Sequence, residues 1–336
     1  MSLEISYDKK LYTKNFYDSP LNGSNSLNVN TRRYYVTLSD NKHKIDDLHI
    51  GPWFITGFSD AEGCFSCSVL KSSSYKFGWE VQLNFQIKLH VRDFPILLGI
   101  QHSLGGIGII SSNQSSCAFR VRKLNELIEL VKFFDKYPLI TRKRGDYLLF
   151  KDIVSIMQLK EHITLEGLQK IINIRATLNF GLSKELQLMF PETIPVPRPL
   201  KETCVIPHSD WIAGFTSGEG NFSVSLDKGI FKSLLFKITQ HEKDEVLLTA
   251  IKEYFNCGYC YLRKQENTID FKVTKFSDVN EIIIPFFINN PILGIKSLDF
   301  NDWCLVSEKV KKGEHKLEGA LKIREIQRGM NRGRSK

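Results

Sequence analysis

One motif occurs twice in the chain, and this duplication restricts the possible folds more than any other feature. The first copy is Trp53-Phe-Ile-Thr-Gly-Phe-Ser-Asp-Ala-Glu-Gly63, and the second is Trp211-Ile-Ala-Gly-Phe-Thr-Ser-Gly-Glu-Gly220. Each copy begins as an apolar helical segment and ends in a glutamate followed by glycine. The sequence therefore predicts two helices that each carry a carboxylate at the C-terminus, Glu62 in the first and Glu219 in the second.

A glutamate at a helix C-terminus is unfavourable by itself, because the helix dipole and the free carbonyl groups there are already negative. The position becomes favourable if a divalent cation binds, since carboxylate and carbonyl oxygens are both hard ligands. Each copy also has two small residues four positions apart that would let the helices approach closely: Gly57 and Ala61, and Gly214 and Gly218. Two ordinary buried helices with solvated terminal glutamates are the alternative, which the repetition disfavours.

The repetition continues beyond the motif. Residues 85–93 match residues 236–244, Pro138 matches Pro291, and the offset stays between 151 and 157 along the chain. A single duplication of this length is not a solenoid period. Each half reads helix–strand–strand–helix–strand–strand–helix, followed by further helices. We therefore predict an α+β fold of two αββαββα half-domains with antiparallel sheets, related by a pseudo-two-fold axis.

The motifs resemble those of the LAGLIDADG homing endonucleases in their single-chain, two-motif form, over about residues 51–336. The runs Phe236-Lys-Ile-Thr-Gln-His-Glu-Lys-Asp244, Thr216-Ser-Gly-Glu-Gly220 and Tyr137-Pro-Leu-Ile-Thr141 are similar to those of the fungal organellar, intron-encoded branch. The resemblance implies a monomer whose two sheets form a DNA-binding saddle. It also implies a mitochondrial location, although we identify no targeting signal.

Composition and linkers suggest four segments. Residues 1–50 have no counterpart in the repeat and predict a polar, partly disordered N-terminal extension. Residues 51–189 and 209–336 form the two half-domains, joined by a proline-rich linker over residues 190–208. The balance of 46 basic to 37 acidic residues, a net charge of +9, suits a polyanion such as nucleic acid. No apolar run approaches the ~20 residues of a membrane span.

Polar and basic residues alternate with apolar ones on the predicted strands, and amides and basic groups are the types that contact bases and phosphates. Sheets lying in successive major-groove segments, ~34 Å apart, would cover a duplex site of roughly 20 bp. The two polar faces differ, so we expect an asymmetric site. The candidate DNA contacts are Cys64, Ser66, Ser68, Gln82, Asn84, Gln86, Lys88, Arg120 and Arg122 in the first half, and Asn221, Ser223, Ser225, Lys237, Thr239, Lys272 and Thr274 in the second.

The expected reaction is metal-assisted phosphodiester hydrolysis, with Glu62 and Glu219 as metal ligands. By resemblance to the family, the backbone carbonyl groups of Ala61 and Gly218 are further ligands, each acid serves one strand, and cutting across the minor groove leaves short 3′ overhangs. All-oxygen ligands suit Mg²⁺, with Mn²⁺ as a substitute and Ca²⁺ binding without supporting cleavage. Lys143 and Lys296 are matched in the repeat and are further catalytic candidates. By resemblance to the family, which keeps a basic or amide residue near the scissile phosphate, they would stabilise charge or order water there.

Other matched polar residues have simpler interpretations. We interpret Asp146 and Asp299 as helix N-caps. We expect His90 and His241 to form structural hydrogen bonds. Asp60 has Ser217 as its counterpart, which argues against an essential role of Asp60 as a ligand.

Three alternative functions remain open. An intron RNA maturase on the same scaffold, alone or combined with the nuclease, would suit the basic surface equally, although it would not need two intact acids. A catalytically inactive DNA-binding regulator would tolerate the loss of a motif acid, and neither is lost. A structural protein is disfavoured by the polar, basic face on strand after strand.

Overall fold

The computed structural model describes residues 50–199, 204–315 and 318–335. The predicted N-terminal extension lies outside the described residues except for Ile50, and so do residues 200–203 of the predicted linker.

The first half forms one four-stranded antiparallel sheet with helices around it. The strand order is β1-β2-β4-β3. The elements are α2 (Pro52–Glu62), β1 (Gly63–Lys71), β2 (Trp79–His90), α3 (Phe94–Ser103), β3 (Ile109–Ser112), β4 (Ser116–Val121), α4 (Leu124–Lys136), α5 (Lys143–Gln158), α6 (Leu165–Arg175) and α7 (Lys184–Met189).

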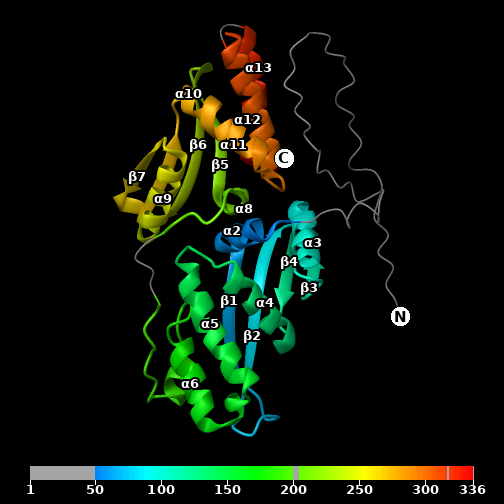
Figure 1. The fold of residues 1–336 in the computed structure, drawn as a ribbon, viewed down its shortest axis with the longest axis vertical. Coiled ribbons are helices and arrows are strands. Elements are labelled where there is room, and N and C mark those ends of the chain that lie inside the picture. Colours follow the sequence, from blue (N-terminus) through cyan, green and yellow to red (C-terminus); the bar gives the residue numbers. More distant parts are fainter. Residues whose placement is uncertain (1–49, 200–203, 316–317, 336) are drawn as a thin grey trace, which may run out of the picture. The chain divides into compact units, whose positions relative to one another are not determined.

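The second half repeats this arrangement with the strand order β5-β6-β8-β7. Its elements are α8 (Ser209–Glu219), β5 (Gly220–Asp227), β6 (Ile230–His241), α9 (Glu245–Phe255), β7 (Tyr259–Arg263), β8 (Thr268–Val273), α10 (Phe276–Asp278), α11 (Ile284–Asn289), α12 (Lys296–Lys311) and α13 (Glu318–Gly329). The predicted α+β duplication, with one antiparallel sheet in each half, is confirmed. Figure 1 shows α2 and α8 packed together where the halves meet.

The strands alternate as their sequences predict. In β1, Phe65 and Val69 are buried while Cys64 and Ser68 are exposed. Each half has its own apolar core on one face of its sheet. Three phenylalanines repeat at matched, fully buried positions in both cores: Phe65 and Phe222, Phe85 and Phe236, and Phe119 and Phe271. The duplicated sequence therefore folds around a duplicated aromatic core.

The interpretation of Asp146 and Asp299 as N-caps is wrong. Helices α5 and α12 begin three residues earlier, at Lys143 and Lys296, so both aspartates lie within the first turn. Thr141 Oγ1 accepts a hydrogen bond from the Lys143 N–H at 3.1 Å, which allows α5 to start early. The Asp146 carboxylate instead pairs with Arg198 at 2.6 Å, and Asp299 pairs with Arg334 at 2.9 Å.

The contact between α2 and α8 is unusually close because glycines lie at the crossing. A Cβ placed on Gly57 would be 2.0 Å from the carbonyl oxygen of Trp211. A Cβ on Gly214 would be 2.1 Å from the carbonyl oxygen of Phe54. Both distances are far below a van der Waals contact, so only glycine fits at these positions. The predicted close approach of the two motif helices is confirmed.

Within the described residues, none of the helices is both long enough and apolar enough to cross a bilayer.

The close helix crossing predicts that replacing glycine by alanine lowers stability at the crossing but not elsewhere. Gly57→Ala or Gly214→Ala would force the two backbones apart, and we expect a loss of about 2–4 kcal/mol in the free energy of unfolding. Gly329→Ala in α13 is the matched control, because a Cβ there meets nothing within 4 Å. That control should be neutral or stabilising by up to about 1 kcal/mol through helix propensity. Urea denaturation of the three variants measures the difference, and equal stabilities would contradict the tight crossing.

Candidate active site

The ends of α2 and α8 bring two carboxylates together. Gly218 makes this possible, because a Cβ on it would lie 2.4 Å from the Cβ of Ala61 and 3.2 Å from Oε1 of Glu62. Burial raises the pKa of Glu62 and of Glu219 above the usual value for glutamate, and the negative charge of Glu62 raises the pKa of Glu219 further. The two acids are therefore near neighbours in a partly desolvated site.

One lysine ammonium group donates hydrogen bonds to the carbonyl oxygens at each of these helix ends. Lys143 Nζ donates to the carbonyl oxygens of Ser59 at 3.2 Å and Ala61 at 3.0 Å. Lys296 Nζ donates to the carbonyl oxygens of Thr216, at 3.2 Å, and Gly218. The carbonyl groups of Ser59 and Thr216 also accept from the N–H groups of Gly63 and Gly220, so each ammonium group adds a second donor there. The ammonium groups also offset the negative end of the helix dipole.

The lysines are strongly buried, which lowers the pKa of both. For Lys296 burial lowers the pKa to about 8, against the opposing effect of the Glu219 and Glu62 carboxylates. Burial likewise lowers the pKa of Lys143, opposed first by Asp60 and then by Glu62. Two carboxylates and two ammonium groups therefore form a compact cluster of compensating charges.

The donor set fits a hard cation. The helix ends offer two carboxylates and backbone carbonyl oxygens, which are all hard ligands. The described residues contain no group of three or more His, Cys, Asp or Glu side chains that could hold a metal ion. The carbonyl oxygens of Ala61 and Gly218 already face a positive charge, that of the lysine ammonium groups. A cavity of about 470 Å³ opens beside Glu62, Gly218 and Lys296, which leaves room for a ligand at this point.

Asp60, next to the site, has a structural role. Its carboxylate accepts hydrogen bonds from Trp211 Nε1 at 2.9 Å, from the Ile140 N–H at 2.9 Å and from Thr141 Oγ1 at 2.6 Å. Its counterpart Ser217 accepts the equivalent bond from the Leu293 N–H at 3.1 Å. Asp60 therefore ties the two halves together through Trp211, as an acceptor that Ser217 replaces only in part.

The two matched histidines make structural hydrogen bonds, as predicted. Nδ1 of His90 accepts from the Arg92 N–H at 3.2 Å, and Nδ1 of His241 accepts from the Lys243 N–H at 3.2 Å. Each bond fixes the turn that follows the second strand of its sheet.

The candidate DNA contacts of the first half lie on the sheet face opposite the core. Cys64 pairs with Gln86 across β1 and β2, and Gln86 pairs with Arg120 across β2 and β4. The Arg120 guanidinium donates to Gln86 Oε1 at 2.8 Å and to Ser111 Oγ at 2.6 Å, and Arg122 donates to Asn84 Oδ1 at 3.3 Å. This face is a connected row of amides and guanidinium groups.

The second sheet has a different polar face. Asn221 pairs with Lys237 across β5 and β6, and Lys237 pairs with Lys272 across β6 and β8. The side chain of Asn221 donates to Asn331 Oδ1 at 3.0 Å, so this amide is already engaged. Thr239 donates to Asp270 Oδ1 at 2.7 Å. The predicted residues of β5, β6 and β8 lie together on one face of the sheet.

Sequence reasoning missed Asp270 and Arg263 on this second face. Asp270 is only 1% exposed, yet its carboxylate receives Lys272 at 3.0 Å and Arg263 at 3.2 Å. It thereby holds two cationic side chains in place. Strand alternation could have identified Asp270, because it lies two residues before Lys272 on the same face. The position of Arg263 depends on the pairing of β7 with β8, which no local pattern reveals.

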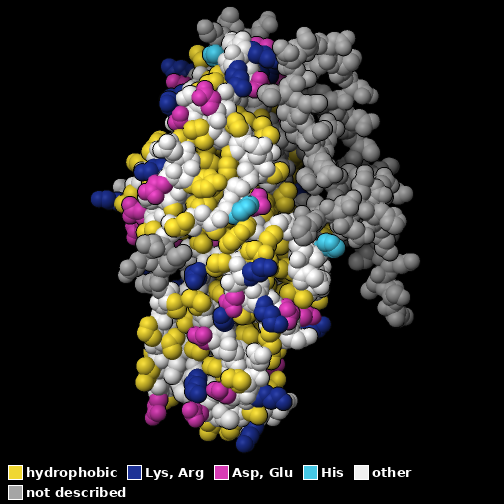
Figure 2. Space-filling model, viewed as in Figure 1, with side chains coloured by type: hydrophobic (Ala, Val, Ile, Leu, Met, Phe, Trp, Pro, Cys, Tyr) yellow, Lys and Arg dark blue, Asp and Glu magenta, His cyan; other side chains and the backbone are white. Residues whose placement is uncertain are grey.

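The opposite, helical side of the molecule is a poorer candidate for binding a polyanion. On the face seen in Figure 2, Lys and Arg side chains are interspersed with acidic and hydrophobic ones and form no continuous basic patch.

The family model for LAGLIDADG endonuclease matches residues 55–154 and 212–307. The chain belongs to the LAGLIDADG endonuclease family. The two matched regions contain both glutamates and both lysines of the site. The resemblance suggested by the motifs is thus confirmed.

Two relatives place the chain within this family. A Neurospora crassa protein named "Probable intron-encoded endonuclease 2" is 41% identical over 295 residues, covering 84% of this chain. This chain spans 65% of the length of that relative. The solved LAGLIDADG homing endonuclease I-SmaMI bound to cleaved DNA is 40% identical, with a TM-score of 0.82 over 85% of this chain and 98% of that one. I-SmaMI was also solved with an uncleaved DNA target in the presence of calcium ions, with a TM-score of 0.81 at 40% identity over 84% of this chain and 99% of that one.

The hydrogen bonds of Asp60 predict a large cost for its removal. Asp60→Ala would leave several buried donors without an acceptor, and we expect the free energy of unfolding to fall by about 3–5 kcal/mol. Ser217→Ala removes the acceptor of one N–H and should cost about 1–2 kcal/mol. Asp152→Ala, at an exposed position of α5, is the control and should change stability by less than about 0.5 kcal/mol. Urea denaturation tests this order, and an Asp60→Ala variant as stable as the control would contradict it.

Proposed function

We propose that this chain is a site-specific double-strand DNA endonuclease. It would recognise a long, asymmetric duplex site of roughly 20 bp and hydrolyse one phosphodiester in each strand with a divalent metal ion. The observation that carries the proposal is the pair of matched glutamate–lysine sets at the adjoining ends of α2 and α8. Family membership supports it, and so does the DNA bound to I-SmaMI.

Glu62 and Glu219, with the carbonyl oxygens of Ala61 and Gly218, would hold the metal ion, which we propose is Mg²⁺, with Mn²⁺ as a substitute. When bound, the ion activates water and neutralises charge on the phosphate. We expect Ca²⁺ to bind without supporting cleavage, which agrees with the uncleaved DNA in the calcium-containing I-SmaMI structure.

The protein itself contributes rigidity and positive charge. The tight crossing of α2 and α8 leaves the two glutamates little freedom to move apart. The ammonium groups of Lys143 and Lys296 lie at the same helix ends, where they would stabilise the negative charge that develops on a phosphate held between them. Because these lysines are buried, their charges act in a medium that screens them less than water.

The two sheet faces would supply recognition. The first is rich in amides and guanidinium groups, and the second combines lysines with a buried aspartate that positions Arg263 and Lys272. Because these faces differ, a target that matches both would be asymmetric. We further propose that the chain acts as a monomer and is the product of an organellar intron gene, in line with its intron-encoded relatives.

Replacement of either motif acid tests the proposal. Glu62→Gln or Glu219→Gln removes a negative ligand while preserving shape, so each should reduce double-strand cutting by about 10²–10³-fold and leave duplex binding nearly unchanged. The substrate is the duplex that the unaltered protein selects from a randomised library in Mg²⁺. Cleavage is followed by end-labelling and binding by filter retention.

The exposed Glu166→Gln on α6 is the control and should cut normally. Full cutting by Glu62→Gln would exclude the proposed ligand role. Tight binding of structured RNA, without cutting of any duplex by the unaltered protein, would exclude the endonuclease and favour a maturase.

A further inference from the structure

The two helices that carry the site lysines begin without a cap from their own N-cap residue. The N-cap positions of α5 and α12 are Arg142 and Ile295, and neither side chain accepts a hydrogen bond there. The first N–H groups of a helix have no helical acceptor, and Ser, Thr, Asp or Asn normally provides one. Within each helix start, tight turns provide acceptors for the second and third N–H groups, such as those of Ser297 and Leu298 at 3.1 Å. The N–H groups of the N-cap residues themselves take their acceptors from elsewhere.

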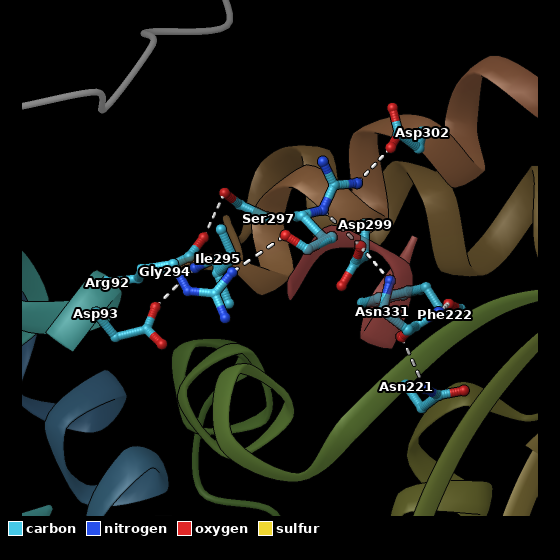
Figure 3. A network of polar contacts seen from close by, with 11 residues as sticks. Arg92, Asp93, Asn221, Phe222, Gly294, Ile295, Ser297, Asp299, Asp302 and Asn331 are labelled. Atoms are coloured by element: carbon cyan, nitrogen blue, oxygen red, sulfur yellow. Dashed lines mark hydrogen bonds and ion pairs between the residues drawn. The ribbon is translucent and has the colours of Figure 1, made fainter. Parts of the chain in front are cut away.

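The acceptors come from the opposite half of the molecule. Oδ1 of Asp93, which follows β2 in the first half, accepts from the Ile295 N–H of the second half at 2.7 Å. Figure 3 shows the Asp93 side chain pointing at the Gly294–Ile295 segment that leads into α12. Oδ1 of Asp244, the matched residue of the second half, accepts from the Arg142 N–H of the first half at 3.4 Å. The two contacts are related by the pseudo-two-fold axis.

The contact of Asp93 is the stronger one, for a local reason. In the first half, Thr141 supplies its own hydroxyl to the Lys143 N–H at 3.1 Å, so α5 has a second acceptor. The counterpart of Thr141 in the second half is Gly294, which has no hydroxyl. Gly294 has a φ of +75°, and a Cβ on it would lie 2.4 Å from Oδ1 of Asp93. The glycine thus makes room for the Asp93 carboxylate, which accepts the N–H of the N-cap residue of α12.

The position of each helix start determines where the ammonium group of its lysine lies. Lys296 directly follows Ile295, and its ammonium group contacts the carbonyl oxygens at the end of α8. Lys143 likewise follows Arg142 and contacts the end of α2. A shift of about 1 Å in a catalytic group can cost up to about 10²-fold in rate. Loss of the carboxylate would therefore displace a group that lies beside the two glutamates.

We propose that Asp93 and Asp244 are positioning residues that act across the pseudo-two-fold axis. Each accepts the N–H of the N-cap residue of the lysine helix in the other half, and so places Lys296 and Lys143 against the glutamates. This rests on the proposed endonuclease function. It implies that each half controls the cleavage of the strand served by the other half, with Asp93 as the more important of the pair.

The first test measures the nicking rate of each strand separately. The substrate is the selected duplex in Mg²⁺, labelled differently on its two strands, and Lys296→Met identifies the strand that depends on Lys296. Asp93→Ala should slow the cutting of that same strand by about 10-fold and change the other strand by less than about 3-fold. Asp93→Asn keeps an acceptor oxygen and should restore the ratio between the strands.

Asp244→Ala should slow the opposite strand, by about 3-fold, because Thr141 still serves α5. A general loss of stability would slow both strands alike, so it could not make the two aspartate variants slow opposite strands. Equal slowing of both strands by Asp93→Ala, or slowing of the same strand by both aspartate variants, would overturn the proposal.

The second test is independent of cleavage. Hydrogen–deuterium exchange at the start of α12 should accelerate about 10-fold in Asp93→Ala, but not in Asp93→Asn or in the control Asp152→Ala. Unchanged exchange in Asp93→Ala would overturn the positioning role even if DNA is cut. If the unaltered protein cuts no duplex, the endonuclease function fails, while accelerated exchange still supports the cap across the axis.

Discussion

The backbone contact between α2 and α8 is the interaction on which the rest of the structure depends. Gly57 and Gly214 let each helix touch the carbonyl group of the other, and Gly218 extends this closeness to the helix ends. Only at such a distance do Glu62 and Glu219 become neighbours. Their mutual repulsion and burial make the site unfavourable in itself, and the surrounding structure has to stabilise it.

That stabilisation comes from groups that cross the axis or close the helix ends. Lys143 and Lys296 donate hydrogen bonds to carbonyl groups at the helix ends, and the Asp60 carboxylate accepts from the indole of Trp211 in the other half. Asp93 and Asp244 extend the same principle to the helices that carry the lysines. Each half therefore completes the other, and neither half contains a whole site.

The two halves depart from exact symmetry at several matched positions. Thr141 and Gly294 occupy matched positions, yet one supplies a hydroxyl and the other makes room for a carboxylate. Asp60 and Ser217 differ in the same way. On the sheets, Asp270 holds Arg263 and Lys272, whereas its counterpart in the repeat is Ala118. A fold with two-fold symmetry thus presents two unlike polar faces.

The sequence by itself determined the duplicated α+β fold, the strands and the two glutamates at helix ends, because these depend on local periodicity and on repeated spacing. The close helix crossing was also predictable, since glycine and alanine four residues apart are a local pattern. Only the tertiary structure decided that Asp146 lies inside a helix, that Asp60 bonds Trp211 and that Asp93 caps α12. These contacts join residues far apart in the chain, and their partners are backbone N–H groups or distant side chains that leave no trace in the local sequence.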